Sequence, residues 1–593
     1  MTSDLQTLAE ESGFTRTGRG DEVERLCAAY AERWPDAVRM FEYGRSSEQR
    51  SMLALLVTRS GRLDAASLRA ASIPLLFIQA GIHPGESDGK DAGFIALREL
   101  LEGRALTRAL ERIAILFVPA FNVDGHERMG RWNRPNQNGP QETGWRVTAR
   151  NLNLNRDYCK ADTPEMQALL RLITHWDPLI CADLHVTDGA DFQPDISLQA
   201  EPINQGDPAL RAAATQLRDE VIARLSAQGS KPLPFYPDFY VTDDPSSGFV
   251  LTVYSPRFST GYFPQRNRFT LLVETHSWKD YRTRVHVTRN TIMDTIEALL
   301  EHGGSWLEQV RAADRAAARI AGAELVLDYR SGWREPGKAG SSGKSQEAEA
   351  TARARMIDFP GYAYTRTLSA ISGTLVTAYD PRTPQNWHVP YRDSVEPSVV
   401  VRTPKAGYVV PTAYAPDIGE RLALHGIAFE HLPRAVEQLP AEHFRASRVD
   451  YAAAPFEGRM RARLEGAWIS RTQTLTAGSL YVPLAQPLAR LIAALLEPQA
   501  PDSFAAWGFF NACFEQKEQL EPYVAEQVAV NMLNENAALA SEFRDKLKQD
   551  AVFAADPVAR LEFFLRRHNS WDERHNLYPI YRVDAHPARP RHS

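Results

Sequence analysis

Residues 74–93 read PLLFIQAGIHPGESDGKDAG, and this stretch decides the fold class of the first half of the chain. Its first seven residues, 74–80, form a nearly continuous apolar run. Such a run is typical of a strand buried on both faces of a largely parallel sheet. The following stretch, 88–102, is predicted to be a helix. A buried strand that leads through a short polar loop into a helix indicates an α/β domain.

Other segments of the chain repeat both halves of this pattern. Apolar strand candidates lie at 53–58, 113–118, 179–184 and 269–274, and further helices are predicted at 164–176 and 289–310. We therefore predict an α/β domain of about 310 residues, in which a mixed, largely parallel sheet is flanked by helices on both sides.

Residues able to bind a metal ion or to exchange a proton follow three of the predicted strands. His83 and Glu86 come after the strand at 74–80, His185 ends the strand at 179–184, and Glu274 ends the strand at 269–274. Open α/β sheets bind their ligands at the carboxyl ends of the strands. Zinc accepts imidazole nitrogen and carboxylate oxygen, and a catalytic site holds three protein ligands and a water molecule. The coincidence of three strand ends favours a metal site over three unrelated structural residues.

A fourth motif, NLNLNRDY at 151–158, places an amide beside a guanidinium. Asn155 and Arg156 are adjacent, and such a pair suits bidentate capture of a terminal carboxylate. Taken alone, the pair would be read as a loop asparagine and a surface arginine.

The ordered set of motifs resembles the M14 family of zinc carboxypeptidases. The set comprises HPGE at 83–86, NVDG at 122–125, NLNLNRDY, His185, and LLVETH at 271–276, and the resemblance covers roughly residues 20–310. It implies a single zinc ion per chain and a peptide substrate with a free C-terminal carboxylate. By this resemblance the zinc ligands are His83, Glu86 and His185, the general base is Glu274, and the residues that hold the substrate carboxylate are Asn155 and Arg156.

Two further family roles have two candidates each. The family uses an arginine between the NVDG and NLNLNRDY motifs to stabilise the oxyanion, and Arg134 is favoured over Arg131. It also uses a tyrosine on a loop upstream of the general base, and Tyr254 is preferred to Tyr262 because of its spacing from Glu274.

The sequence after residue 325 changes character. We expect a catalytic domain over 1–325, a flexible linker or loop over 326–355, a β-rich or mixed accessory domain over 356–480, and a helical C-terminal region over 481–593. The linker assignment depends on the Gly, Ser, Lys and Glu content of 336–350, which has no apolar periodicity.

Composition restricts the partners and the compartment. A net charge of −6 over 593 residues gives no reason to expect nucleic acid or an anionic membrane as a partner, and no stretch approaches the length of a membrane helix. No signal peptide is visible, and the four scattered cysteines form no CxxC pair. We expect a cytoplasmic protein, or a periplasmic or secreted one if a leader has been removed.

The function predicted from the sequence is hydrolysis of the C-terminal peptide bond through a metal-activated water, with Glu274 as general base. The alternatives are a zinc-dependent amidase or deacylase, a cell-wall peptide hydrolase, and a non-catalytic peptide-binding protein. Only the Asn155–Arg156 pair favours a free α-carboxylate over another acyl substrate.

Overall fold

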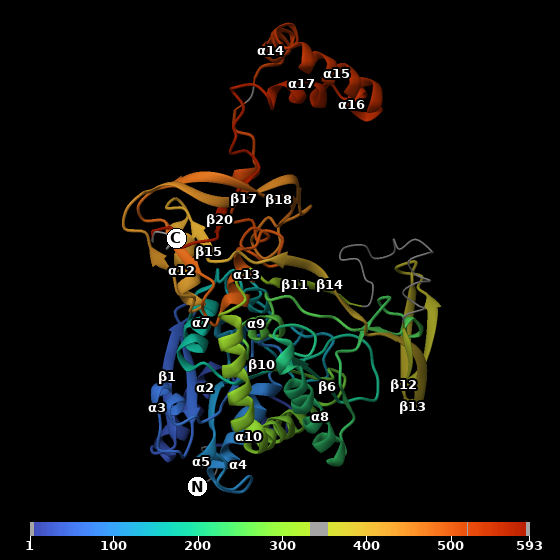
Figure 1. The fold of residues 1–593 in the computed structure, drawn as a ribbon. Coiled ribbons are helices and arrows are strands. Elements are labelled where there is room, and N and C mark those ends of the chain that lie inside the picture. The colour runs from blue at the N-terminus through green and yellow to red at the C-terminus, as the bar shows by residue number, and fades with distance from the viewer. Residues whose placement is uncertain (1–4, 332–353, 519, 589–593) are drawn as a thin grey trace.

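The computed structural model describes residues 5–331, 354–518 and 520–588. Its centre is an eight-stranded mixed sheet (Figure 1). In spatial order the strands are β1 (Val38–Arg45), β2 (Ser51–Val57), β4 (Ala114–Val118), β3 (Leu75–Ala80), β5 (Ile180–Val186), β10 (Phe269–Thr275), β6 (Ile196–Glu201) and β7 (Pro232–Leu233).

The four central strands, β4, β3, β5 and β10, run parallel. Nearly every residue in them is buried, because helices cover both faces of the sheet. The carboxyl ends of β3, β5 and β10 therefore meet at one edge of the sheet, where ligand sites of open α/β sheets form. The prediction of a largely parallel α/β sheet flanked by helices is confirmed.

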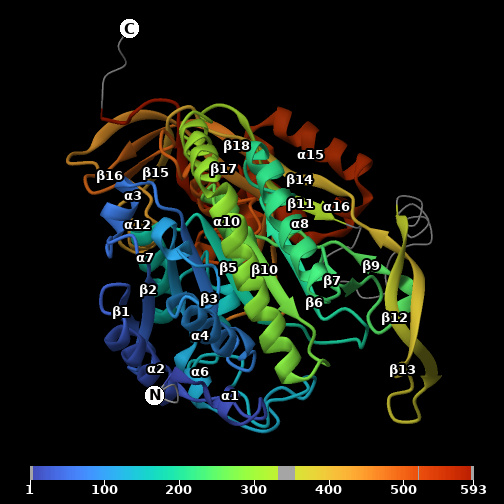
Figure 2. The same ribbon diagram turned by 90° about the horizontal axis from the view of Figure 1, so that it is seen from below.

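Helices α4, α8 and α10 pack along one face of the sheet (Figure 2), while α7 and α9 lie on the opposite face beneath the C-terminal region (Figure 1). The helices of this domain are α1 (Leu8–Glu11), α2 (Gly20–Arg33), α3 (Ala65–Ala70), α4 (Asp88–Leu101), α5 (Ala109–Arg112), α6 (Val123–Glu127), α7 (Pro164–Trp176), α8 (Arg211–Ala227), α9 (Ser259–Gln265) and α10 (Tyr281–Ala317).

Helix α10 is longer than the predicted 289–310. It begins after Asp280, whose side chain accepts a hydrogen bond from the Thr283 amide and caps the first turn. Gly303 lies within this helix at a point where a Cβ would meet the ring of Pro74 at 2.9 Å. The glycine thus allows the helix to approach the start of β3 closely.

The described residues form three smaller sheets as well. A four-stranded sheet joins the long hairpin of β12 (Arg355–Leu368) and β13 (Leu375–Arg392) to β9 (Phe249–Val250) and β8 (Asp238–Phe239), and β11 (Glu324–Ser331) pairs with β14 (Val395–Arg402). A six-stranded antiparallel sheet contains β16 (Glu430–His431), β19 (Leu480–Pro483), β15 (Gly407–Val410), β20 (Leu577–Val583), β17 (Val436–Tyr451) and β18 (Ala462–Leu475).

The remaining helices are of two kinds. Helices α12 (Ala415–Leu424) and α13 (Ala489–Leu496) pack onto α7 and α9 and share one continuous hydrophobic core with the eight-stranded sheet. A group of four helices, which stands beyond the six-stranded sheet in Figure 1, has a separate small core. These are α14 (Pro522–Glu535), α15 (Ala537–Gln549), α16 (Ala551–Ala555) and α17 (Pro557–Leu565).

The structure arranges the second half differently from the predicted division at 480. Strand β20 belongs to the stretch predicted to be helical, yet it lies between β15 and β17 of the six-stranded sheet. The predicted linker over 326–355 overlaps most of β11, and its residues 332–353 lie outside the described residues. Within the described part of the chain, no helix combines the length and apolar character needed to cross a bilayer.

Candidate metal centre

His83 and Glu86 lie in the tight loop between β3 and α4. The amide of Glu86 donates to the carbonyl of His83 at 2.9 Å, which closes a turn that carries both side chains. Gly85 between them is required by packing, because a Cβ there would meet Cγ of Arg134 at 2.4 Å. The loop therefore fixes both side chains at the carboxyl end of β3.

His185 reaches the same place from β5. One ring nitrogen, Nδ1, lies 3.0 Å from Oε2 of Glu86, and the other, Nε2, lies 3.1 Å from Oδ2 of Asp183. Asp183 is itself held by Gln79, at 2.8 Å, and by the hydroxyl of Ser259, at 2.5 Å. A carboxylate behind a histidine fixes the orientation of the ring and is the usual support of a metal-binding histidine.

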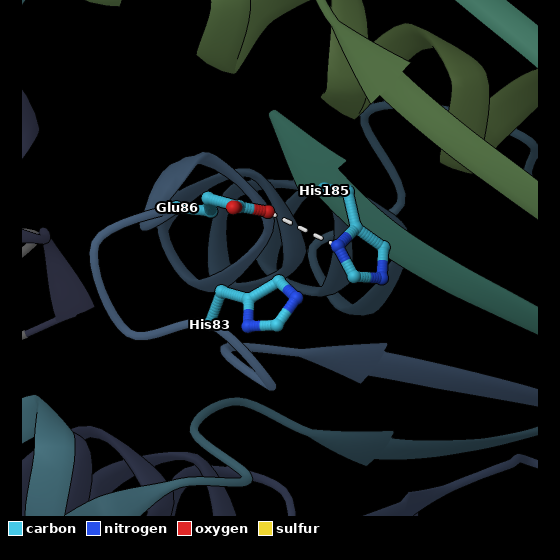
Figure 3. A group of neighbouring side chains, drawn as sticks. All are labelled: His83, Glu86 and His185. Atoms are coloured by element: carbon cyan, nitrogen blue, oxygen red, sulfur yellow. Dashed lines mark hydrogen bonds and ion pairs between the residues drawn. The ribbon is translucent and has the colours of Figure 1, made fainter. Parts of the chain in front are cut away.

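The donor atoms of His83, Glu86 and His185 lie within 4.8 Å of one another (Figure 3). All three side chains are buried, and Nδ1 of His83 has no hydrogen-bond partner among the described residues. Burial lowers the pKa of His83 well below its usual value, so its ring is neutral and has a lone pair available for a metal. Two imidazoles and one carboxylate are a donor set that zinc accepts, and the residues fit such an ion.

The charges around the three side chains support the same fit. Burial raises the pKa of Glu86, but the charge of Arg134 and the two histidines outweigh it and hold the pKa well below its usual value. Burial lowers the pKa of His185, yet the carboxylates of Asp183 and Glu86 raise it well above the usual value. Glu86 is thus an anionic carboxylate, and the site attracts positive charge. A bound metal ion would supply that charge in place of the proton on His185.

A cavity of about 340 Å³ opens beside this cluster. The sequence-predicted residues that line it are His83, Glu86, Asn155, Arg156, His185, Tyr254 and Glu274. Arg134 does not line it, and neither do Arg131 and Tyr262. Among the other residues that line it are three titratable ones that the sequence analysis did not select, namely Arg146, Asp188 and Tyr236.

Glu274 on β10 is the acid/base candidate of this cavity. Burial raises its pKa to about 8, helped by the charges of Glu86 and Asp188, although His185 acts in the opposite direction. A carboxyl group with a pKa near neutrality is suited both to accept and to return a proton.

Asn155 and Arg156 lie on a short 3₁₀ helix, Leu154–Arg156, that the side chain of Asn153 caps. The guanidinium of Arg156 lies 4.2 Å from the centre of the Phe258 ring and donates to the carbonyl of Asn155 at 2.6 Å. Burial lowers its pKa to about 10, so it remains cationic at neutral pH. Among the described residues no carboxylate lies within ion-pair distance of it, which leaves its charge available to a ligand in the cavity.

The two arginines near Glu86 differ in their surroundings. Each nitrogen of the Arg134 guanidinium already has a protein acceptor: Oε1 of Glu86 at 3.0 Å, Oε1 of Gln137 at 3.1 Å, and the carbonyls of Val186 and Thr187. Arg146 lies 3.3 Å from the same Glu86 oxygen, but its side chain is 39% exposed, against 8% for Arg134. Arg146 also lies between the NVDG and NLNLNRDY motifs, and that position was the sequence signal that could have identified it.

The two tyrosine candidates lie in different environments. Tyr254 borders the cavity, and burial, followed by the charge of Glu274, raises its pKa. Tyr262 is fully buried and bonds Nδ1 of His425 at 2.9 Å, so it packs the C-terminal region against the sheet domain. Arg131 stacks on the exposed ring of Trp132, at 5.0 Å.

Comparison with known proteins agrees with this chemistry. Residues 23–191 match the family model described as zinc carboxypeptidase, Peptidase_M14. "Carboxypeptidase 2" of Trichophyton equinum is 24% identical over 451 residues, and that of Trichophyton rubrum is 23% identical over 446 residues; each match covers 73% of both chains. Among solved structures, the carboxypeptidase A from Helicoverpa armigera is similar, with a TM-score of 0.37 and 15% identity over 49% of this chain and 74% of that chain.

Residues 23–191 are thus a zinc carboxypeptidase domain of the M14 family, and the chain is a metallopeptidase. The family is zinc-dependent, in agreement with the donor set of His83, Glu86 and His185.

Proposed function

We propose that the protein is a metallocarboxypeptidase that removes the C-terminal residue of peptides, with one zinc ion per chain held by His83, Glu86 and His185. The observation that carries the proposal is the composition of one cavity. It joins a metal-competent triad, a carboxyl group with a pKa near 8, and a guanidinium that has no carboxylate partner among the described residues.

The acid/base work is assigned to Glu274. When bound, zinc supplies a Lewis acid that lowers the pKa of a water molecule and polarises a carbonyl group. The Glu274 carboxylate accepts the proton of the attacking water and later donates it to the nitrogen of the leaving amine.

Substrate orientation is assigned to Asn155 and Arg156. The amide and the guanidinium would both donate to the terminal carboxylate, and a planar guanidinium can bind the two oxygens with parallel hydrogen bonds. This anchor fixes the last peptide bond over the metal site and makes the enzyme an exopeptidase. Tyr254, at the border of the cavity, would contact the bound substrate.

Stabilisation of the oxyanion was predicted for Arg134, but Arg146 is better placed for it. Arg134 is occupied in holding Glu86 and the end of β5, whereas Arg146 presents a partly exposed guanidinium to the cavity. We therefore assign the contact with the oxyanion to Arg146 and the support of Glu86 to Arg134.

A peptide library in which every C-terminal residue is represented tests the proposal. Incubation with the enzyme, followed by mass spectrometry, should show the loss of single C-terminal residues, and a chelator should abolish it. Release of internal fragments, or hydrolysis of simple N-acyl amides in preference to peptides, would favour the endopeptidase or amidase alternative.

A further inference from the structure

The C-terminal region contacts the NLNLNRDY motif of the catalytic domain through the hairpin that connects β17 and β18. Residues 452–461 form its tip, where Phe456 and Arg459 exchange backbone hydrogen bonds of 2.9 and 3.1 Å around Glu457 and Gly458. More than 290 residues of chain separate this tip from the NLNLNRDY motif, yet the two are in direct contact.

The contact is made by the side chain of Glu457. Its Oε2 accepts a hydrogen bond from the backbone amide of Asn153 at 2.7 Å. Asn153 in turn holds the next turn of chain: its side chain accepts from the amide of Asn155 at 3.0 Å, and its carbonyl accepts from the amide of Arg156 at 3.0 Å. A hydrogen bond to an ionised acceptor is stronger than one between neutral groups. The Glu457 carboxylate therefore holds Asn153, and Asn153 accepts hydrogen bonds from the amides of both Asn155 and Arg156.

The hairpin tip is itself held firmly on the catalytic domain. Arg459 makes two hydrogen bonds, of 2.6 and 2.7 Å, to the carboxylate of Asp162, while within the C-terminal region the ring of Phe456 stacks on Trp507. Glu457 has a backbone φ of 50°, a left-handed conformation in which asparagine, aspartate or glycine is usual for such a two-residue turn. A glutamate at this position has a longer side chain than those residues, and here that length is used to reach Asn153.

The C-terminal region also holds the loop with Arg257 and Phe258, which contacts Arg156 from another side. The carboxylate of Asp502, which is buried, accepts from the amide of Arg257 at 2.9 Å. The next residue, Phe258, provides the ring on which Arg156 stacks at 4.2 Å. Residues beyond 450 thus hold both the loop that carries Arg156 and the loop whose Phe258 ring it contacts.

We propose that Glu457 is a positioning residue for the Asn155–Arg156 pair, so that the C-terminal region takes part in recognising the substrate's terminal carboxylate. This inference rests on the proposed function. It assigns a role to a part of the chain in which the sequence contained no recognisable motif.

Two substitutions separate this role from general stability. Glu457→Asn favours the left-handed turn but shortens the side chain so that it no longer reaches Asn153, whereas Glu457→Gln keeps both length and an acceptor oxygen. Glu465→Asn, on the exposed face of β18, is the matched control. The readouts are kcat and KM on a peptide with a free C-terminal acid and on its C-terminal amide, and hydrogen–deuterium exchange of peptides covering 151–158.

Glu457→Asn should raise KM for the acid about tenfold, as expected when a hydrogen bond to a charged group is lost, with a smaller change in kcat. It should leave the amide nearly unaffected and should speed exchange in 151–158. Glu465→Asn should resemble the wild type in both readouts, and Glu457→Gln, which keeps an acceptor oxygen but not the charge, should lie between the wild type and Glu457→Asn.

Two results would overturn the proposal. If the wild type prefers the acid but Glu457→Asn keeps the wild-type KM, the positioning role is wrong while the carboxypeptidase function stands, even if exchange becomes faster. If the wild type does not distinguish acid from amide, the terminal-carboxylate anchor fails, and this inference fails with it.

Discussion

Glu274 and His185 are direct neighbours in the sheet, as register partners on the parallel strands β10 and β5. Side chains of register partners in parallel strands point to the same face. The proposed general base therefore lies beside a proposed metal ligand because of the strand register, without depending on a flexible loop. Rigid elements place catalytic groups more accurately than loops do.

Replacing Glu274 with glutamine should abolish turnover while zinc remains bound. The amide has nearly the same shape but cannot accept the proton of water, so kcat should fall by at least the roughly 10²–10⁴-fold typical of general acid–base catalysis. Steady-state kinetics, metal analysis and circular dichroism of the purified variant test this. A kcat close to the wild type would move the base elsewhere, with Glu86 and Asp188, which line the same cavity, and Asp183 behind His185 as the carboxylates to consider.

Zinc should be present at about one ion per chain in protein purified without chelator, because three protein ligands complete one catalytic site. Asp183→Asn should weaken zinc binding by roughly 10–100-fold, since the carboxylate that orients His185 is lost. Competition with a coloured chelator measures the affinity.

Asp188→Asn is the control for zinc binding. Asp188 lines the cavity, but among the described residues it makes no hydrogen bond with either histidine ligand. Equal zinc affinity in the two variants would remove Asp183 from the metal site, and full activity of His83→Ala and His185→Ala would remove the ligand assignment itself.

The two arginines near Glu86 should be separable by kinetics. Arg146→Ala should lower kcat by about 10²–10³-fold, as the loss of one oxyanion donor does in other hydrolases. If Arg146→Ala is nearly as active as the wild type and Arg134→Ala accounts for the whole loss, the oxyanion role returns to Arg134.

Acid should destabilise the packing of the C-terminal region on the sheet domain through His425. Its neutral ring donates from Nε2 to the carbonyl of Cys159 at 3.1 Å and accepts from Tyr262 at Nδ1, and burial lowers its pKa to about 3. The unfolded chain binds this proton near pH 6.5, so the folded state is favoured above that pH. The contribution is lost as pH falls from 6.5 toward 3, at about 1.4 kcal/mol per pH unit.

His425→Gln should therefore be less stable than the wild type at pH 8 but should lose less stability between pH 7 and pH 5. Urea unfolding at several pH values measures the slope. His126, whose pKa burial also lowers to about 3, is the comparison, because His126→Gln should flatten the slope to a similar extent. An unchanged slope in His425→Gln would mean that its ring does not take up a proton on unfolding.

The sequence predicted the catalytic half well because its signals are local. Each central strand is a nearly continuous apolar run, and the predicted ends of β3, β5 and β10 lie within two residues of the observed ones. The metal-competent residues follow directly from these ends. Because parallel strands end at the same edge of a sheet, the residues at the ends of β3, β5 and β10 could be predicted to lie together.

The second half was harder to predict because its pairings are non-local. Strand β20, LYPIYRV, follows four helices in the sequence and becomes a strand only because β15 and β17 lie on either side of it. Glu457 has no motif around it, and its role depends on contact with Asn153, more than 300 positions away. Arg146 and Arg134 could not be ranked from the sequence, since the difference between them is the set of acceptors that surround each guanidinium.

The last prediction separates a carboxypeptidase from an amidase. If Arg156 binds the terminal carboxylate, removing the substrate charge should be as damaging as removing the guanidinium, because each change destroys the same ion pair. A peptide that ends in a C-terminal amide should be hydrolysed far more slowly than the same peptide with a free acid. Arg156→Ala should raise KM for the acid and also lower kcat, since the anchor positions the scissile carbonyl.

Against the amidated peptide, Arg156→Ala should cost little, because the partner charge is already absent. The cycle formed by two enzymes and two substrates measures the coupling energy between the guanidinium and the carboxylate. Arg131→Ala is the matched control, since Arg131 stacks on Trp132 and does not line the cavity, and it should leave the preference for the acid unchanged. Strictly additive losses, or equal hydrolysis of acid and amide by the wild type, would show that Arg156 does not bind a terminal carboxylate, and the amidase or endopeptidase alternative would then be the better description.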